Sequence, residues 1–326
     1  QAPLAPYVAL WTRLADFQPT ELSTLLLDRA VVRIALMRGT IYLVTAADCL
    51  SFRPLLQPVL ARAFQATYGK RIAGVDLEPL VVAGRAYLTK RPRTINELGR
   101  HLAARWPEHD GHALSQAIRN LVPLVQVPPR GLWGASGPAA HAPADVWLGR
   151  SPSVEPAIDD LVLRYLAAYG PATVHDIQTW SGLTRLGPVL YRLRPRLATF
   201  QDELGNELFD LPEAPRPCPD SPAPLRFLAE FDTALLSHRD RTRIISDAQR
   251  RVVFTVNGIV KGTILVDGFV AGIWNIISSR TDATLRIDSF APLPAATQAG
   301  LAEEGERLLH FAAVDASTHD IRFATL

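Results

Sequence analysis

The residues from 154 to 210 constrain the fold most, because they predict three short helices and a hairpin in one continuous stretch. Apolar residues recur at helical spacing up to Gly170-Pro171, where the first helix should end. Thr173 and Thr184 are predicted to cap two further helices. Two short apolar runs then flank Leu204-Gly205-Asn206, a turn sequence that predicts a hairpin. Three helices followed by a hairpin are typical of a winged helix.

The third helix predicted in this stretch carries several arginines, among them Arg185 and Arg192. A helix of this kind enters the major groove of DNA, where arginine reaches phosphates or guanine edges. Winged helices also serve as protein-contact modules, so a scaffold role stays open. A DNA-binding module would bind DNA in a salt-dependent manner, whereas a protein scaffold would not.

The same pattern occurs earlier in the chain, which indicates repeated units. Tyr87-Leu88 precedes the capping-box sequence Thr94–Leu98 much as Tyr165-Leu166 precedes Thr173–Ile177. Two further hairpins are expected, one with strands at 31–36 and 40–44 and one with strands at 125–127 and 132–133. The repetition predicts tandem winged helices.

The periodicity changes after residue 211. Residues 212–224 are rich in proline and poor in apolar side chains, which predicts a linker. Short apolar runs then alternate with turns such as Asp267-Gly268, and a helix is expected from about Ala295 to Val314. The C-terminal third is therefore predicted to form a small β-barrel with one helix packed on it.

These signals together predict an α+β fold in which tandem winged-helix repeats precede a C-terminal β-barrel. The expected parts are a first winged-helix unit at 1–75, N-terminally incomplete, a second at 76–150, a third at 151–211, a linker at 212–224, and a barrel with one helix at 225–326.

The composition excludes several classes of protein. No apolar run among the 326 residues approaches the roughly 20 needed to span a bilayer, so a cytoplasmic protein is expected. Cys49 and Cys218 lack the spacing of a zinc site or a disulfide scaffold, and no metal or cofactor is expected. The net charge of +2 means that any DNA-binding charge must gather on one face. Arginine greatly outnumbers lysine, which fits a GC-rich coding bias or a use of arginine for phosphate contacts.

A polar alternation follows the first predicted strand. On an extended strand, Arg38, Thr40 and Tyr42 would share one face, opposite Ile41 and Leu43. Arg38 and Thr40 could then bind a phosphate while Tyr42 stacks on a base or sugar. The alternative is an edge strand with ordinary polar residues facing outward.

A second polar cluster opens the C-terminal part. Glu230 and Asp232 would share one face of a strand, and Arg239 and Arg241 follow closely. The cluster could face DNA, or it could be a network of charges that braces the barrel.

Several short motifs, taken in order, resemble the AlkZ-like family of winged-helix DNA glycosylases. The resemblance covers nearly the whole chain. It rests on Gln1-Ala2-Pro3, Tyr7–Trp11, Leu36–Thr40, Pro129–Gly134, Glu230–Asp232, Ser237–Arg241 and Leu265–Gly268 with Gly272 and Trp274. Tyr42 departs from the pattern, because many relatives are expected to carry histidine there.

This resemblance implies a stack of three winged helices and a barrel that clasps double-stranded DNA and removes alkylated purines, in some members also unhooking interstrand crosslinks. It assigns Gln1 to the second position of a catalytic pair written Gln-x-Gln or Gln-x-Asp, whose first member would lie two residues earlier. A carboxamide can hold and orient water against the sugar. The DNA contacts expected are Arg38, Thr40, Tyr42, Arg130, Arg185, Arg192, Arg239 and Arg241.

The resemblance also sets the expected surroundings of the protein. A nucleoid-associated position in the cytoplasm is expected, with no membrane partner and no obligate protein partner evident. The alternative is a non-catalytic winged-helix DNA-binding protein, such as a transcriptional regulator.

Overall fold

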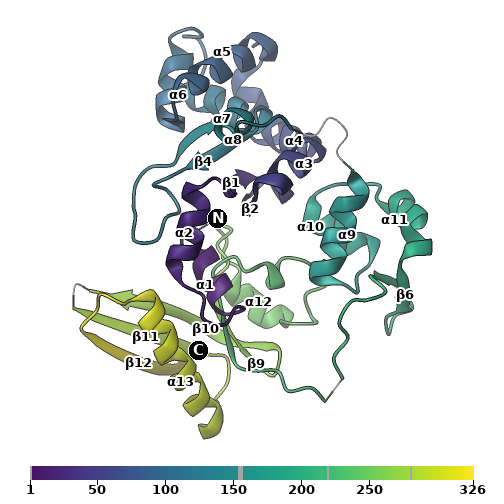
Figure 1. Ribbon diagram of the computed structural model, residues 1–326, viewed down its shortest axis with the longest axis vertical. Coiled ribbons are helices and arrows are strands. Elements are labelled where there is room, and N and C mark those ends of the chain that lie inside the picture. The colour runs from purple at the N-terminus through teal and green to yellow at the C-terminus, as the bar shows by residue number, and fades with distance from the viewer. Residues whose placement is uncertain (1, 153–156, 219, 280) are drawn as a thin grey trace. The chain divides into compact units, whose positions relative to one another are not determined.

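The computed structural model describes residues 2–152, 157–218, 220–279 and 281–326. The chain mixes helices and strands and divides into two compact units (Figure 1). The first unit contains residues 18–214, and the second contains residues 2–17 and 215–326. Among the described helices, none combines the length and the hydrophobicity that a membrane span requires.

The first module of the first unit, residues 18–72, is a hairpin between helices. Its elements are α2 (Pro19–Leu27), β1 (Val31–Ala35), η1 (Met37–Gly39), β2 (Ile41–Thr45), α3 (Ala46–Leu55), α4 (Gln57–Thr67) and η2 (Gly69–Ile72). The side chain of Thr45 accepts a hydrogen bond from the backbone N–H of Asp48 and so caps α3.

The second module, residues 77–148, begins with three helices. Its elements are α5 (Leu77–Lys90), β3 (Arg93–Thr94), α6 (Ile95–Ala103), α7 (Gly111–Leu121), β4 (Leu124–Val127), β5 (Ala140–Pro143) and α8 (Ala144–Leu148). Thr94 and Glu97 form the expected capping box at the start of α6.

The second strand of this module lies later in the chain than expected. β4 pairs with β5, with Val127 opposite Ala140, and not with residues 132–133. Residues 128–139 form a loop that is held elsewhere: the N–H of Trp133 donates to Ser23 Oγ at 3.2 Å, and Gly131 lies against Arg33. These contacts of the loop outcompete the local pairing that the short apolar run predicts.

The third module, residues 158–210, has the expected order of helices and hairpin. Its elements are α9 (Ile158–Tyr169), α10 (Val174–Ser181), α11 (Gly187–Leu193), η3 (Arg194–Arg196), β6 (Ala198–Gln201) and β7 (Glu207–Asp210). Thr173 caps α10, as predicted. Thr184 does not cap α11, because Arg185 has a left-handed φ of 61° and Pro188 lies at the start of a helix that begins only at Gly187.

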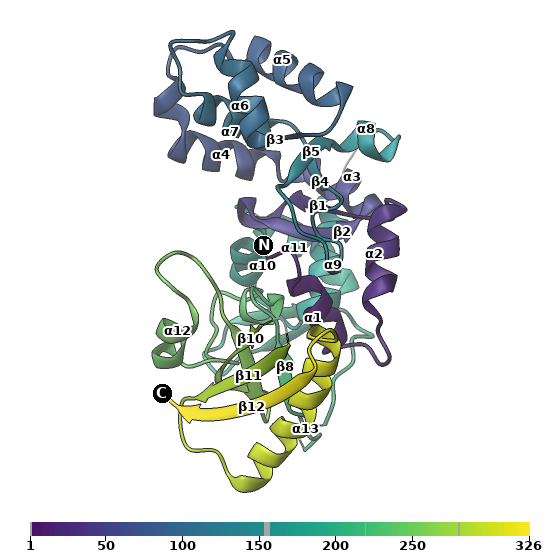
Figure 2. The ribbon, with the colours of Figure 1, turned by 90° about the vertical axis from the view of Figure 1, so that its left-hand side faces the viewer.

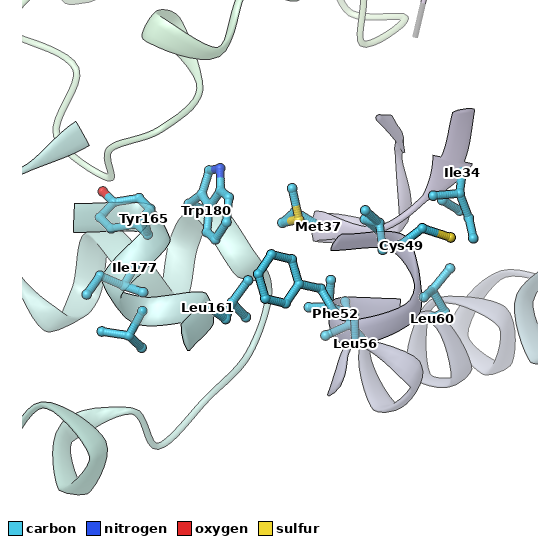
Figure 3. Close-up of a cluster of buried hydrophobic side chains, with 14 of the residues drawn as sticks. Ile34, Met37, Cys49, Phe52, Leu56, Leu60, Leu161, Tyr165, Ile177 and Trp180 are labelled. Atoms are coloured by element: carbon cyan, nitrogen blue, oxygen red, sulfur yellow. The ribbon is translucent and has the colours of Figure 1, made fainter. Parts of the chain in front are cut away.

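Two hydrophobic cores hold the first unit together. Strands of the first two modules form one sheet in the order β2-β1-β4-β5-β3. The larger core contains side chains of all three modules: Figure 3 shows Phe52 of α3 beside Leu161 of α9, with Trp180 of α10 near Met37. The smaller core lies among α4, α5, α6 and α7 and includes Phe64, Leu80, Leu98 and Leu114.

The second unit is built on one sheet covered by a helix (Figure 2). Its elements are α1 (Ala5–Trp11), β8 (Arg226–Leu228), η4 (Thr233–Leu235), α12 (Asp247–Val253), β9 (Gly262–Val266), β10 (Phe269–Ser278), β11 (Asp282–Ser289), α13 (Ala295–Ala312) and β12 (Thr318–Thr325). The described residues of 212–224 lie outside helices and strands.

The described strands of this unit do not close into the predicted C-terminal barrel. The described strands form an open sheet in the order β12-β11-β10-β9-β8, in which β12 pairs parallel to β11. Leu301, Leu308 and Leu309 of α13 cover the apolar face that carries Phe227 and Leu285. The helix therefore encloses this core, and the sheet has no need to close on itself.

Candidate nucleic-acid interface

The turn between β1 and β2 places the first candidate residues differently from the expected strand alternation. Residues 37–39 form a 3-10 turn in which Arg38 has a φ of 55°, so Arg38 does not continue the face of Tyr42 along a strand. Thr40 Oγ1 donates to the carbonyl of Met37 at 3.2 Å. The turn curls back over β2, which still brings Arg38 and Tyr42 together.

The guanidinium of Arg38 links Tyr42 to the end of α10. Its Nη2 donates to the Tyr42 hydroxyl at 2.7 Å, and its Nη1 donates to the carbonyl of Trp180 at 2.8 Å. Burial raises the pKa of Tyr42, against the lowering effect of Arg38, so the phenol is neutral at pH 7. Arg38 thus binds the third module to the first.

A second arginine supports the same helix end. Arg62 of α4 donates to the carbonyl of Gly182, the residue that ends α10, at 3.0 Å. The last carbonyls of a helix carry partial negative charge and lack partners within the helix, so cations bind there favourably. Arg38 and Arg62 together complete the C-terminus of α10.

Gly182 allows the end of α10 to lie close to Val59 and Arg38 of the first module. Its φ is +79°, and a Cβ at this position would lie 2.9 Å from Val59 Cγ1 and 3.5 Å from the Cα of Arg38. Only glycine adopts this conformation without strain and leaves room for the first module.

Gly182→Ala is therefore expected to lower the free energy of unfolding by about 1 to 3 kcal/mol, since alanine meets both backbone strain and a steric contact. The matched control is Gly205→Ala, because Gly205 has a φ of +78° and a Cβ added there would meet nothing within 4 Å. Urea denaturation of both variants measures the difference. If both variants lost the same free energy of unfolding, the steric contact with the first module would contribute nothing to the effect of Gly182→Ala.

The surface of α11 and its flanks presents cations and an aromatic ring. Arg185 and Arg196 are exposed, and within the described ranges their side chains make no hydrogen bond or ion pair. Tyr191 is 78% exposed. Arg192 pairs with Asp159, and Arg194 pairs with Glu207 at 2.5 Å. Among the described residues, Arg185 and Arg196 on the flanks of α11 are therefore unpaired, and the sequence pattern placed both away from the apolar face.

The corresponding helix of the second module is not available for binding. Residues 113–118 of α7 are all buried against α4, α5 and α6. Burial also lowers the pKa of Arg119 at the end of this helix. In the third module, by contrast, Pro188, Tyr191 and Arg192 of α11 are exposed.

The other candidates belong to other segments of the chain. Arg130 Nη1 donates to the carbonyl of Gly137 at 3.1 Å and so braces the loop at 128–139. In the second unit, Arg239 is exposed, while the guanidinium of Arg241 lies 4.8 Å from the centre of the Phe254 ring. Gln1 lies outside the described residues.

Glu230 and Asp232 belong to a turn and not to a strand. β8 ends at Leu228, and Phe231 has a left-handed φ of 56°. Asp232 is buried, caps η4, and accepts both hydrogen bonds of a paired arrangement from Arg13 at 2.7 and 2.9 Å. This carboxylate therefore ties the segment that follows α1 to the turn that follows β8, within one unit. In the described part of the chain, no three His, Cys, Asp or Glu residues gather as metal ligands would.

Comparison with known proteins decides the family. The family model described as DNA glycosylase AlkZ-like matches residues 1–311. The chain belongs to the AlkZ-like DNA glycosylase family.

A curated sequence and a solved structure, both from Streptomyces sahachiroi, are similar to this chain. One, named an interstrand DNA cross-link repair glycosylase, is 27% identical over 164 residues, which cover 45% of this chain and 41% of that protein. The chain thus spans less than half of that relative's length. The solved structure of the DNA glycosylase AlkZ superposes with a TM-score of 0.76 at 20% identity, covering 98% of this chain and 89% of that one. It shares the fold.

The AlkZ-like chain uses residues that its sequence did not single out. Arg62 carries no motif, and its contact with α10 joins residues 120 positions apart. Tyr191 lies between Leu190 and Leu193, two apolar residues of the same helix. The packing of α11 shows that its ring faces solvent. Neither residue has a local signal that distinguishes it from a solvated side chain.

Proposed function

We propose that this chain is a DNA glycosylase that binds double-stranded DNA and hydrolyses the N-glycosidic bond of alkylated purines, including purines held in interstrand crosslinks. The observation that carries the proposal is the family match over residues 1–311. The name of the Streptomyces cross-link repair glycosylase supports the crosslink substrate. Such an enzyme acts in base excision repair at the nucleoid.

The three modules are proposed to act as tandem winged helices. Each pairs helices with a hairpin, and the third presents the exposed side chains of Arg185 and Arg196 on the two flanks of α11. Arginine forms forked hydrogen bonds to phosphate and to guanine, so this surface suits duplex DNA. Arg38 and Tyr42 are proposed to keep the third module in position for that contact, and Arg239 and Arg241 to add contacts from the second unit.

The chemistry proposed for Gln1 follows from the substrate. Alkylation of a purine at N7 or N3 places positive charge on the base, so the base departs readily and needs little acid catalysis. The remaining task is to place a water molecule against the oxocarbenium-like sugar. A neutral amide is no general base, but its carbonyl and NH₂ groups can hold that water in line. No metal or cofactor enters the proposal.

Release of base from defined DNA tests the enzyme. The full-length protein is incubated with a duplex that contains one N7-methylguanine, and abasic sites are measured as strand breaks after alkali. We expect abasic product at the modified position and none in an unmodified duplex. Intact DNA binding without product would support a non-catalytic DNA-binding protein, such as a regulator, and overturn the glycosylase proposal.

A further inference from the structure

A basic patch lies where α5 meets α6 in the second module. Residues 89–105 contain five lysines and arginines but only one carboxylate, that of Glu97. Lys90, Arg91 and Arg100 are exposed, and no carboxylate of the described chain pairs with any of the three. We call these three residues the α5–α6 patch.

Several other exposed arginines of this protein have an acidic partner. Arg164 pairs with Asp48 at 2.8 Å, Arg286 pairs with Asp288 at 2.8 Å, and Arg322 pairs with Asp320 at 2.6 Å. The chain as a whole is almost neutral, with 34 lysines and arginines against 32 acidic residues. An unpaired group of cations on one short segment is therefore a local concentration of charge.

The patch is held on a rigid base. The rings of Tyr87 and His101 stack at 3.9 Å with an interplanar angle of 7°, which joins α5 to α6. The guanidinium of Arg93 lies 4.8 Å from the centre of the Tyr87 ring. Lys90 follows Tyr87 by three positions and so lies near it on the last turn of α5, and Arg91 is the extended residue that ends this helix. Cations fixed on ordered backbone lose less conformational entropy when they bind a ligand.

The burial of α7 limits which surface of the second module can contact DNA. Its third helix is enclosed by α4, α5 and α6 and has no face to place in a groove. The charged surface of this module at α5 and α6 carries exposed lysine and arginine side chains. Such a surface binds the sugar–phosphate backbone, which presents regularly spaced negative charge and requires no base contact.

We propose that the α5–α6 patch is a second DNA-binding surface, which binds backbone phosphates of the duplex without reading its sequence. The inference rests on the proposed function, because it takes duplex DNA as the ligand. In this proposal the second module adds affinity for the DNA backbone, and the third module makes the contacts with bases. Each cation that neutralises a phosphate releases condensed counterions, so the patch strengthens binding most at low salt.

The test compares two triple variants of the full chain. The first is Lys90→Gln, Arg91→Gln, Arg100→Gln. The control is Arg164→Gln, Arg286→Gln, Arg322→Gln, which removes the same charge from paired residues elsewhere. Dissociation constants for two unmodified duplexes of unrelated sequence are measured by fluorescence anisotropy at several salt concentrations. Circular dichroism and thermal melting confirm that each variant is folded.

We expect the patch variant to bind both duplexes about 10-fold or more weakly at low salt, with the salt slope reduced by up to about 3. The control should keep the affinity and slope of the wild-type protein. An unchanged slope in the patch variant, or an equal loss in the control, would overturn the inference. Absence of DNA binding by the wild-type protein would instead overturn the proposed function from which the inference starts.

Discussion

Gln1→Ala is expected to slow the release of N7-methylguanine by about 100-fold, with little change in DNA affinity. The expected loss follows from the proposed role: without the amide, the attacking water has no fixed position, and a misplacement of about 1 Å can cost that factor. The measurement is a single-turnover rate of abasic-site formation with enzyme in excess, together with the dissociation constant for the same duplex.

The control for this variant is Gln201→Ala. Gln201 is an exposed residue of β6, and within the described ranges its side chain makes no hydrogen bond. It should keep the wild-type rate. If Gln1→Ala also kept that rate, Gln1 would not be the water-positioning residue. If both variants lost DNA binding, the effect would lie in the fold and not in the chemical step.

Phe52→Ala is expected to lower the free energy of unfolding by about 3 to 5 kcal/mol. Phe52 is 8% exposed and belongs to the core that the first and third modules share. In Figure 3 its ring points toward Leu161 of α9, so its removal opens a cavity between the modules. Loss of a buried aromatic ring combines the lost transfer energy with the cost of the cavity. Denaturation in guanidinium chloride gives the change in stability.

The matched control is Val82→Ala on α5, because Val82 is 63% exposed. Its expected loss is below about 1 kcal/mol. Hydrogen exchange adds a local readout: in Phe52→Ala, amides of α9 should exchange faster, since the third module loses a contact with the first. A change below about 1 kcal/mol for Phe52→Ala would mean that the modules do not depend on this shared core.

Local elements were predictable where short-range chemistry decides them. Thr94 and Thr173 each begin a helix through a side-chain hydrogen bond to a backbone N–H three residues later, and the turn at 204–206 closes a hairpin. Family membership was also readable, because it depends on motifs in sequence order. These features need no information about distant parts of the chain.

The structural predictions that proved wrong concern segments in which contacts with distant residues compete with local signals. Residues 132–133 do not pair with β4 as predicted, because the loop that contains them contacts Ser23 and Arg33. The second unit forms an open sheet because α13, which lies between β11 and β12 in the chain, covers its apolar face. Apolar alternation predicts that a face is buried, but it does not say whether a helix or another part of the sheet buries it.

The amino-acid sequence was enough to predict the family, the order of most helices and the residue types available for binding DNA. Which of those residues remain available depends on how the chain packs. Arg38, Arg192 and Arg194 make hydrogen bonds or ion pairs within the first unit, whereas Arg185, Arg196 and the α5–α6 patch make no ion pair with any residue that the structure describes. The reason is that a charge is paired or free according to what the folded chain brings within a few ångströms of it, and those neighbours come from distant positions in the sequence.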